Sequence, residues 1–125
     1  MSDQFARTRM LYGDDAVEKF RKSRVAVFGI GGVGGHVVEA LVRSGIGTVD
    51  IIDNDTVSLT NINRQLIATH ETVGRLKVDV MEEHIRNINP DCVVNKFNMF
   101  VLPENICDFD FSQYDYVVDA IDTVS

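Results

Sequence analysis

Four glycines within six residues follow a short apolar run and come before a helical pattern. Gly29, Gly31, Gly32 and Gly34 lie directly after residues 25–28. Because glycine has no Cβ, such a turn can bring backbone amides at a helix N-terminus close to a phosphate. Asp53 ends the next predicted strand, where an acid can accept a hydrogen bond from a ribose hydroxyl. The pattern favours a nucleotide site over a tight structural turn, and it leaves the identity of the nucleotide open.

A polar segment follows the second predicted strand. It contains Asp55, Asn61, Arg64 and Gln65. We expect Thr60 or Asn61 to cap a short helix, and residues three and four apart then share one helix face. That spacing would place Asn61, Arg64 and Gln65 together. The segment is either a polar surface that faces a ligand or a solvated capping segment.

Two further charged residues lie where ligand chemistry is expected. Lys77 falls in the first turn of a predicted helix, where a cation opposes the helix dipole unless an anion meets it. Asp122 comes just after the fourth predicted strand, on the rim where open parallel sheets bind ligands. The structural alternatives are a solvated lysine and a helix-capping aspartate.

Strands and helices alternate along most of the chain. Runs of β-branched and aromatic residues predict four strands, at residues 24–28, 48–53, 91–97 and 114–120. Apolar residues at helical spacing predict one helix at 32–44, where Val33, Val37, Ala40 and Leu41 repeat, and a second helix that residues 72–74 introduce and Asn89-Pro90 ends. Strand–helix–strand units of this length give parallel sheets with right-handed crossovers. The sequence therefore predicts an α/β fold with a Rossmann-like, doubly wound, mostly parallel sheet.

The chain divides into two predicted parts. Residues 1–22 form an N-terminal arm and helix, and residues 23–125 form a nucleotide-binding domain. The basic arm is either solvated, or its Arg7 or Arg9 reaches a bound phosphate. The sequence stops at Ser125, where a doubly wound fold would continue with another helix and further strands. We therefore expect this to be the N-terminal part of a longer domain.

The composition is that of one ordinary domain, with 45% hydrophobic residues in 125. The sequence has neither an apolar run of membrane-spanning length nor a basic-then-apolar leader, so the cytoplasm is the expected location. Cys92, Cys107, His36, His70 and His84 share no metal-ligand spacing and are expected at the surface or in packing. The net charge of −7 argues against a general nucleic-acid-binding face, although a local basic pocket fits it.

Four motifs occur in a fixed order along nearly the whole chain. They are the glycine turn at 29–34, the polar segment at 53–65, Gly74-Arg75-Leu76-Lys77 and Asp119-Ala120-Ile121-Asp122. Together they resemble the adenylating domain shared by ubiquitin-activating enzymes and the bacterial activators of sulfur-carrier proteins. Within this E1-like family, residues 7–9, 44–47 and 120–124 look most similar to the tRNA threonylcarbamoyladenosine dehydratase branch.

The resemblance implies ATP rather than NAD as the nucleotide. It implies that Arg64 and Lys77 meet the charge that builds on phosphate oxygens when a carboxylate attacks the α-phosphate and expels pyrophosphate. Asn61 and Gln65 match the positions that orient the phosphates.

The resemblance also assigns the remaining site residues. Asp53 would bind the ribose, with Asp55 nearby. Asp122 matches a residue that holds Mg²⁺, a hard ion that prefers carboxylate and phosphate oxygens. Arg7 matches an arginine that enters the ATP site of a neighbouring subunit in relatives, so the resemblance implies a homodimer.

Substrate choice separates the branches of the family. The dehydratase branch implies tRNA as the partner, with the threonylcarbamoyl carboxylate of a modified adenosine next to the anticodon activated and then closed into a ring with loss of water. The alternative branch activates the C-terminus of a ubiquitin-like protein, with a sulfur-carrier or cysteine desulfurase-type partner. Two further classes are an NAD-dependent oxidoreductase, which gives Arg64, Lys77 and Asp122 no role, and a member that only binds nucleotide.

Overall fold

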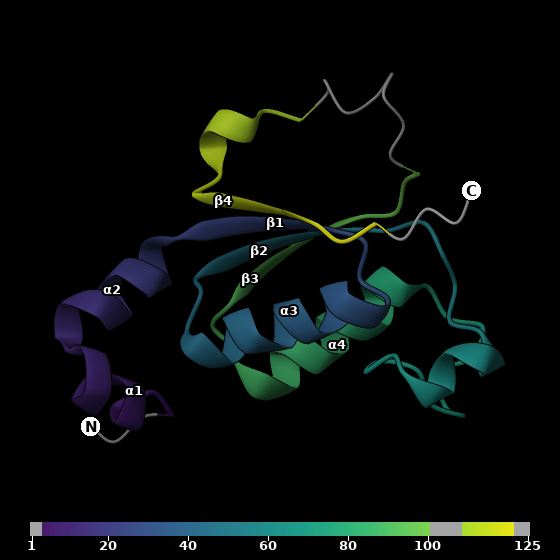
Figure 1. The fold of residues 1–125 in the computed structure, drawn as a ribbon, viewed down its shortest axis with the longest axis horizontal. Coiled ribbons are helices and arrows are strands. Elements are labelled where there is room, and N and C mark those ends of the chain that lie inside the picture. The colour runs from purple at the N-terminus through teal and green to yellow at the C-terminus, as the bar shows by residue number, and fades with distance from the viewer. Residues whose placement is uncertain (1–3, 101–108, 122–125) are drawn as a thin grey trace.

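The computed structural model describes residues 4–100 and 109–121 of the chain. Strands alternate with helices after two N-terminal helices (Figure 1). In chain order the elements are α1 (Ala6–Tyr12), α2 (Asp14–Lys22), β1 (Arg24–Phe28), α3 (Gly32–Ser44), β2 (Thr48–Ile52), the 3-10 helix η1 (Leu59–Asn63), α4 (Lys77–Ile88), β3 (Val93–Phe97), the 3-10 helix η3 (Phe111–Gln113) and β4 (Tyr116–Asp119).

The strands of the described part form one parallel sheet in the order β3-β2-β1-β4. Phe28 at the end of β1 pairs with Ile52 of β2 on one side and with Asp119 of β4 on the other. The chain builds outward from β1 through β2 to β3 and then crosses to the far side of β1. The predicted α/β, doubly wound arrangement is confirmed. The reversal of direction lies between β1 and β4, where open parallel sheets bind ligands beyond the strand ends.

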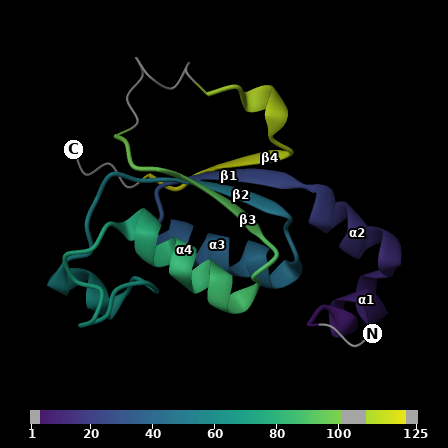
Figure 2. The same ribbon diagram turned by 180° about the vertical axis from the view of Figure 1, so that it is seen from behind.

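The two faces of the sheet pack against different layers. α3 and α4 lie side by side on one face in both views (Figures 1 and 2). Their side chains Val38, Met81 and Ile85 pack with Val27 and Ile51 of the strands, and this cluster is the main core. The opposite face carries a smaller cluster of Ala26, Phe28 and Ile52 against Phe97, Met99, Phe109 and Tyr114.

The sheet contains a fully buried carboxylate, Asp50 of β2. Arg24 Nη2 and the Tyr114 hydroxyl each donate to Asp50 Oδ2 at 2.6 Å, and Asn95 Nδ2 donates to Oδ1 at 2.8 Å. Burial, together with the hydrogen bond to Asp50, raises the pKa of Tyr114 to about 12, so its hydroxyl remains a donor. The network joins β1, β2, β3 and the segment before β4, and it fixes how these strands lie against one another.

We expect Tyr114→Phe to destabilise the protein by about 1.5–3 kcal/mol, because it removes a hydrogen bond to a buried charged group. Urea unfolding measures the effect. Tyr116→Phe is the matched control, since Tyr116 is 67% exposed and its change is expected to stay within about 0.5 kcal/mol. Equal losses in the two variants would show that the Tyr114 hydroxyl contributes nothing to stability.

The N-terminal segment differs from its predicted form. Residues 6–12, expected as a basic arm, form α1, and Gly13 with a φ of 88° separates this helix from α2. α2 begins with Asp14 and Asp15 as predicted. Gln4 Nε2 donates to the carbonyl of Ile88 at 2.8 Å, so the segment contacts the end of α4.

The other element boundaries agree with the sequence to within about two residues at most ends. β4 begins at Tyr116 rather than at residue 114, because the Tyr114 amide donates to the Phe111 carbonyl at 3.2 Å and so belongs to the turn of η3. Cys92 is buried as predicted, and burial raises the pKa of its thiol to about 11. The helix start expected at 103–105, together with Cys107, lies outside the described residues.

Within residues 4–100 and 109–121, no helix has the length and apolar character needed to cross a membrane. The same residues contain no group of three or more histidine, cysteine or acidic side chains arranged to hold a metal ion. His36 and His70 are exposed as expected, and His84 Nε2 lies 3.0 Å from Glu39 Oε1.

Candidate nucleotide-binding site

The glycine turn joins β1 to α3 with very little space. Gly29 has a φ of 87°, and a Cβ on Gly34 would lie 1.6 Å from the Gly29 carbonyl oxygen. α3 therefore begins directly against the end of β1. The Gly34 amide donates to the Gly31 carbonyl at 3.1 Å, and the amides of Gly32 and Val33, which precede the first bonds within the helix, can meet an anion. Gly31 and Gly32 form the turn itself.

Asp53 connects this turn to the next segment. Its Oδ2 accepts from the Ile30 amide at 3.0 Å, and its Oδ1 accepts from the Asp55 amide at 2.8 Å. The carboxylate lies beside the turn, where a ribose was expected. Each oxygen keeps a lone pair for a further donor.

The short helix after Asp53 is capped differently from the prediction. η1 begins after Ser58, so the expectation that Thr60 or Asn61 would cap it is wrong. Asn61 lies inside η1 and is buried, and its Oδ1 accepts from the Ser58 amide at 2.9 Å. This oxygen closes the turn, and the Asn61 side-chain nitrogen is the group that can donate to a phosphate oxygen.

Arg64 and Gln65 follow η1, and both lie near the glycine turn. Arg64 is exposed, and its Nη1 donates to the Thr60 carbonyl and to Asn63 Oδ1, both at 3.0 Å. The Gln65 amide packs on Gly31, where a Cβ would lie 2.8 Å from Nε2. Gln65 Oε1 is buried, and no described residue bonds to it. A polar atom in this situation is satisfied when a ligand or water supplies a donor.

A shallow groove of about 540 Å³ runs from the glycine turn along α3. Val33, Val37 and Ala40 of the predicted stripe line it, whereas Leu41 packs against the core together with Val38 and Val42. Val33 is 72% exposed. The remaining lining residues are Gly32, His36 and Arg64. The sequence showed the helical spacing of these residues but not which face of α3 is buried. That face depends on the contact of Gly34 with Gly29 at the end of β1.

Lys77 is the first residue of α4 and is 6% exposed. In the described part of the chain its ammonium has one ion pair, with Asp55 Oδ2 at 3.7 Å. An ammonium enclosed at a helix N-terminus is disfavoured by desolvation and by the helix dipole. This position therefore suits a cation that is completed by an anionic ligand.

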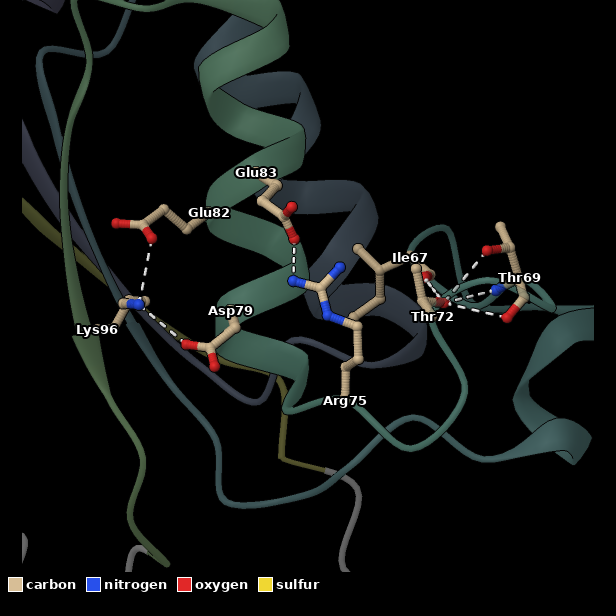
Figure 3. A network of polar contacts seen from close by, with 8 residues as sticks. All are labelled: Ile67, Thr69, Thr72, Arg75, Asp79, Glu82, Glu83 and Lys96. Carbon is tan, nitrogen blue, oxygen red and sulfur yellow. Dashed lines mark hydrogen bonds and ion pairs between the residues drawn. The ribbon is translucent and has the colours of Figure 1, made fainter.

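Polar contacts around α4 hold the segment that presents Lys77 (Figure 3). On one side Lys96 Nζ of β3 lies 2.9 Å from Asp79 Oδ1 and 3.1 Å from Glu82 Oε1. On the other side Arg75 pairs with Glu83. The Thr72 hydroxyl donates to the Ile67 carbonyl at 2.7 Å and accepts from the Thr69 amide at 2.8 Å, which closes the preceding turn.

The structure brings most of the predicted site residues to one edge of the sheet and leaves Arg7 aside. The turn, Asp53 and Gln65 are in contact, as are Asp55 and Lys77. Arg7 is exposed on α1, at the opposite end of the sheet from the glycine turn (Figures 1 and 2). Asp122 lies outside the described residues.

The ThiF family model matches residues 5–125. The chain belongs to the ThiF family. This ThiF-family chain is 50% identical over 121 residues to a tRNA threonylcarbamoyladenosine dehydratase of Haemophilus influenzae, covering 97% of the chain and 46% of that protein. It is 39% identical over 103 residues to an adenylyltransferase and sulfurtransferase, uba4, of Ogataea parapolymorpha, covering 82% of the chain and 26% of that protein.

A solved structure agrees closely with this ThiF-family chain. The E. coli tRNA N6-threonylcarbamoyladenosine dehydratase in complex with ATP matches it with a TM-score of 0.93 at 46% identity, covering 97% of the chain and 50% of that protein. The chain thus spans about half the length of the dehydratases it matches. The family resemblance found in the sequence motifs is confirmed.

Proposed function

We propose that the whole protein carrying this chain uses ATP to activate a carboxylate, and that the carboxylate belongs to N6-threonylcarbamoyladenosine in tRNA. The identity of 50% to one dehydratase, against 39% to the adenylyltransferase, favours this substrate. The observation that carries the chemistry is Lys77, an enclosed cation with one carboxylate at 3.7 Å on the same edge of the sheet as the glycine turn.

The reaction begins with displacement at phosphorus. A carboxylate oxygen bonds to the α-phosphorus of ATP, and the bond to the β-phosphate oxygen breaks with release of pyrophosphate. Negative charge grows on the oxygens of both phosphate groups, and fixed cations stabilise it most where water is excluded. Lys77 and Arg64 have this role in the proposal, while the turn at Gly29–Gly34 and the first amides of α3 bind phosphate oxygens.

Ring closure completes the proposed reaction. A nucleophile within the same threonylcarbamoyl side chain attacks the activated carbonyl, and AMP leaves. The net change in the nucleoside is the loss of one water, and the oxygen of that water is carried away by AMP. This step needs no enzyme cysteine. The proposal gives Asp53 the ribose and gives Asn61 and Gln65 the orientation of the phosphates.

The proposal includes Mg²⁺ as a counter-ion to the phosphates, with Asp122 as the expected ligand. It also includes a cytoplasmic location. If the carrier-protein branch is the correct one, the expected partner is a sulfur carrier or a cysteine desulfurase-type protein in place of tRNA.

A homodimer is the proposed assembly, with Arg7 acting at the neighbouring subunit's site. Two exposed apolar surfaces support it. α1 has no buried residue and exposes Met10, Leu11 and Tyr12, and the stripe along the α3 groove exposes Val33. Apolar patches of this kind are typical of protein–protein contacts.

Mixing two inactive variants tests whether Arg7 acts between subunits. We expect Arg7→Ala and Lys77→Met to be slow alone and to recover about a quarter of the wild-type rate when co-expressed, because half of the dimers are mixed and each has one complete site. Pyrophosphate release by the purified mixture measures this. A mixture no faster than its components would place Arg7 outside the partner's site.

Pyrophosphate release by the full-length protein tests the substrate assignment. With ATP we expect release on adding tRNA that carries the threonylcarbamoyl group, and none with tRNA that lacks it. Release only with a ubiquitin-like carrier would move the protein to the adenylyltransferase branch. Binding of NAD in preference to ATP in a parallel titration would contradict both and favour the oxidoreductase.

A further inference from the structure

Asp55 and Lys77 are connected through their backbones as well as their side chains. The Lys77 amide donates to the Asp55 carbonyl at 3.0 Å. Next to this contact, Thr56 and Leu76 form an antiparallel bridge, and the Val57 amide donates to the Arg75 carbonyl at 2.8 Å. The strand-like pairing of these two segments fixes where α4 begins relative to Asp55.

The same segment is joined to the glycine turn. Asp53 accepts from the amides of Ile30 and Asp55 with its two oxygens. The contacts therefore run without a break from the turn through Asp53 and Asp55 to Lys77. Asp53 is the carboxylate that reaches the turn, whereas Asp55 directs its Oδ2 at Lys77.

The two side chains of the ion pair are in unequal surroundings. The Lys77 side chain is 7% exposed and the Asp55 side chain is 65% exposed. At 3.7 Å the pair is longer than a hydrogen bond, so the carboxylate attracts the ammonium while leaving its donors available. The Asp55 carboxylate therefore restricts the orientation of the Lys77 ammonium, while the N–H groups of the ammonium stay available to a phosphate.

We propose that Asp55 is a positioning residue that acts through Lys77: its carboxylate orients the buried ammonium toward the phosphate site and does not itself contact the nucleotide. This inference rests on the proposed function, because it takes Lys77 as the cation that meets the phosphates. It changes the role of Asp55, which the sequence placed near the ribose.

A double-mutant cycle in the full-length protein tests the proposal. Asp55→Asn is expected to lower the single-turnover rate of pyrophosphate release about tenfold, the size of coupling usual for residues in contact, while the Kd for ATP stays within about twofold. In the Lys77→Met background the same substitution is expected to change the rate less than about twofold. Asp55→Glu, which keeps the carboxylate, should recover part of the rate.

Asp79→Asn is the matched control. It removes a carboxylate from the first turn of the same helix, and its partner is Lys96 rather than Lys77. We expect it to leave the rate unchanged. An Asp55→Asn effect of equal size with and without Lys77, or a several-fold rise in the Kd for ATP, would overturn the proposal and make Asp55 a ligand-contacting residue.

Amine labelling of Lys77 separates failure of this inference from failure of the proposed function. With an acetylating reagent and peptide mass spectrometry, Asp55→Asn should raise labelling at Lys77 at least threefold over other lysines, because the Lys77 amino group loses the carboxylate that restricts its orientation. Unchanged labelling would overturn the inference even if the protein is an active dehydratase. Raised labelling in a protein that does not act on tRNA would support the Asp55 contact and contradict the proposed substrate.

Discussion

Lys77→Met is expected to lower the rate of pyrophosphate release by the full-length protein about 10²–10³-fold, with the fold retained. This is the usual cost of removing one preorganised group that stabilises charge in a transition state. Methionine keeps most of the apolar stem in its buried position at the start of α4, so packing is largely preserved. Single-turnover kinetics measure the rate, and circular dichroism with thermal unfolding reports the fold.

Lys96→Met is the control for the Lys77 result. Lys96 lies on β3 and pairs with Asp79 and Glu82, so its loss is expected to change stability slightly and the rate by less than about twofold. A Lys77→Met variant that keeps more than a tenth of the rate would contradict the proposed role of Lys77. Loss of the folded state in that variant would instead indicate a structural role.

Gly34→Ala is expected to destabilise the protein by about 3 kcal/mol or more and to abolish ATP binding. Alanine normally stabilises an exposed helix position by about 0.5–1 kcal/mol relative to glycine. A loss of stability in Gly34→Ala would therefore be opposite to the effect of helix propensity. Here the new Cβ would lie 1.6 Å from the Gly29 carbonyl oxygen, which is backbone and cannot rotate away. α3 would have to move off β1, and overpacking of this kind is among the costliest changes in a core.

Gly74→Ala provides the comparison for Gly34. Gly74 has a φ of 91°, and a Cβ there would meet no described residue within 4 Å, so alanine there meets backbone strain without a clash, at a cost of about 1 kcal/mol. Urea unfolding and ATP titration of both variants in the full-length protein give the result. A Gly34→Ala protein as stable as the wild type that still binds ATP would disprove the close contact between α3 and the turn.

The parts of the fold that follow from local pattern were predictable from the sequence. β1 and α3 begin and end where they were expected, because the apolar run and the glycine turn are local signals, as is Gly45, which ends α3 in the left-handed conformation. α1 was not predicted, because residues 6–12 have no buried face and therefore show no amphipathic pattern. The buried position of Asp50 was also not predicted. Its partners Arg24, Asn95 and Tyr114 are far from it in the sequence, and only the folded sheet brings them together.

The site was predictable as a set of residues and only partly as an arrangement. The order of motifs identified the family and the turn, Asp53, Arg64 and Lys77. The contact of Asp55 with Lys77 and the packing of Gln65 on Gly31 depend on how separate segments meet, which spacing alone does not determine. The cap at Ser58 displaced the predicted one because the helix it starts is a tight 3-10 turn.

Mass analysis of the nucleosides in tRNA tests the central claim most directly. The chain carries a net charge of −7, which opposes binding to the phosphates of tRNA, so action on tRNA is a stringent test of the proposed function. Full-length protein, ATP and tRNA bearing N6-threonylcarbamoyladenosine are incubated, and the tRNA is digested. We predict that this nucleoside is replaced by one lighter by a single water, only when ATP is present. An unchanged nucleoside, in a preparation that binds ATP and releases pyrophosphate with a carrier protein, would contradict the account.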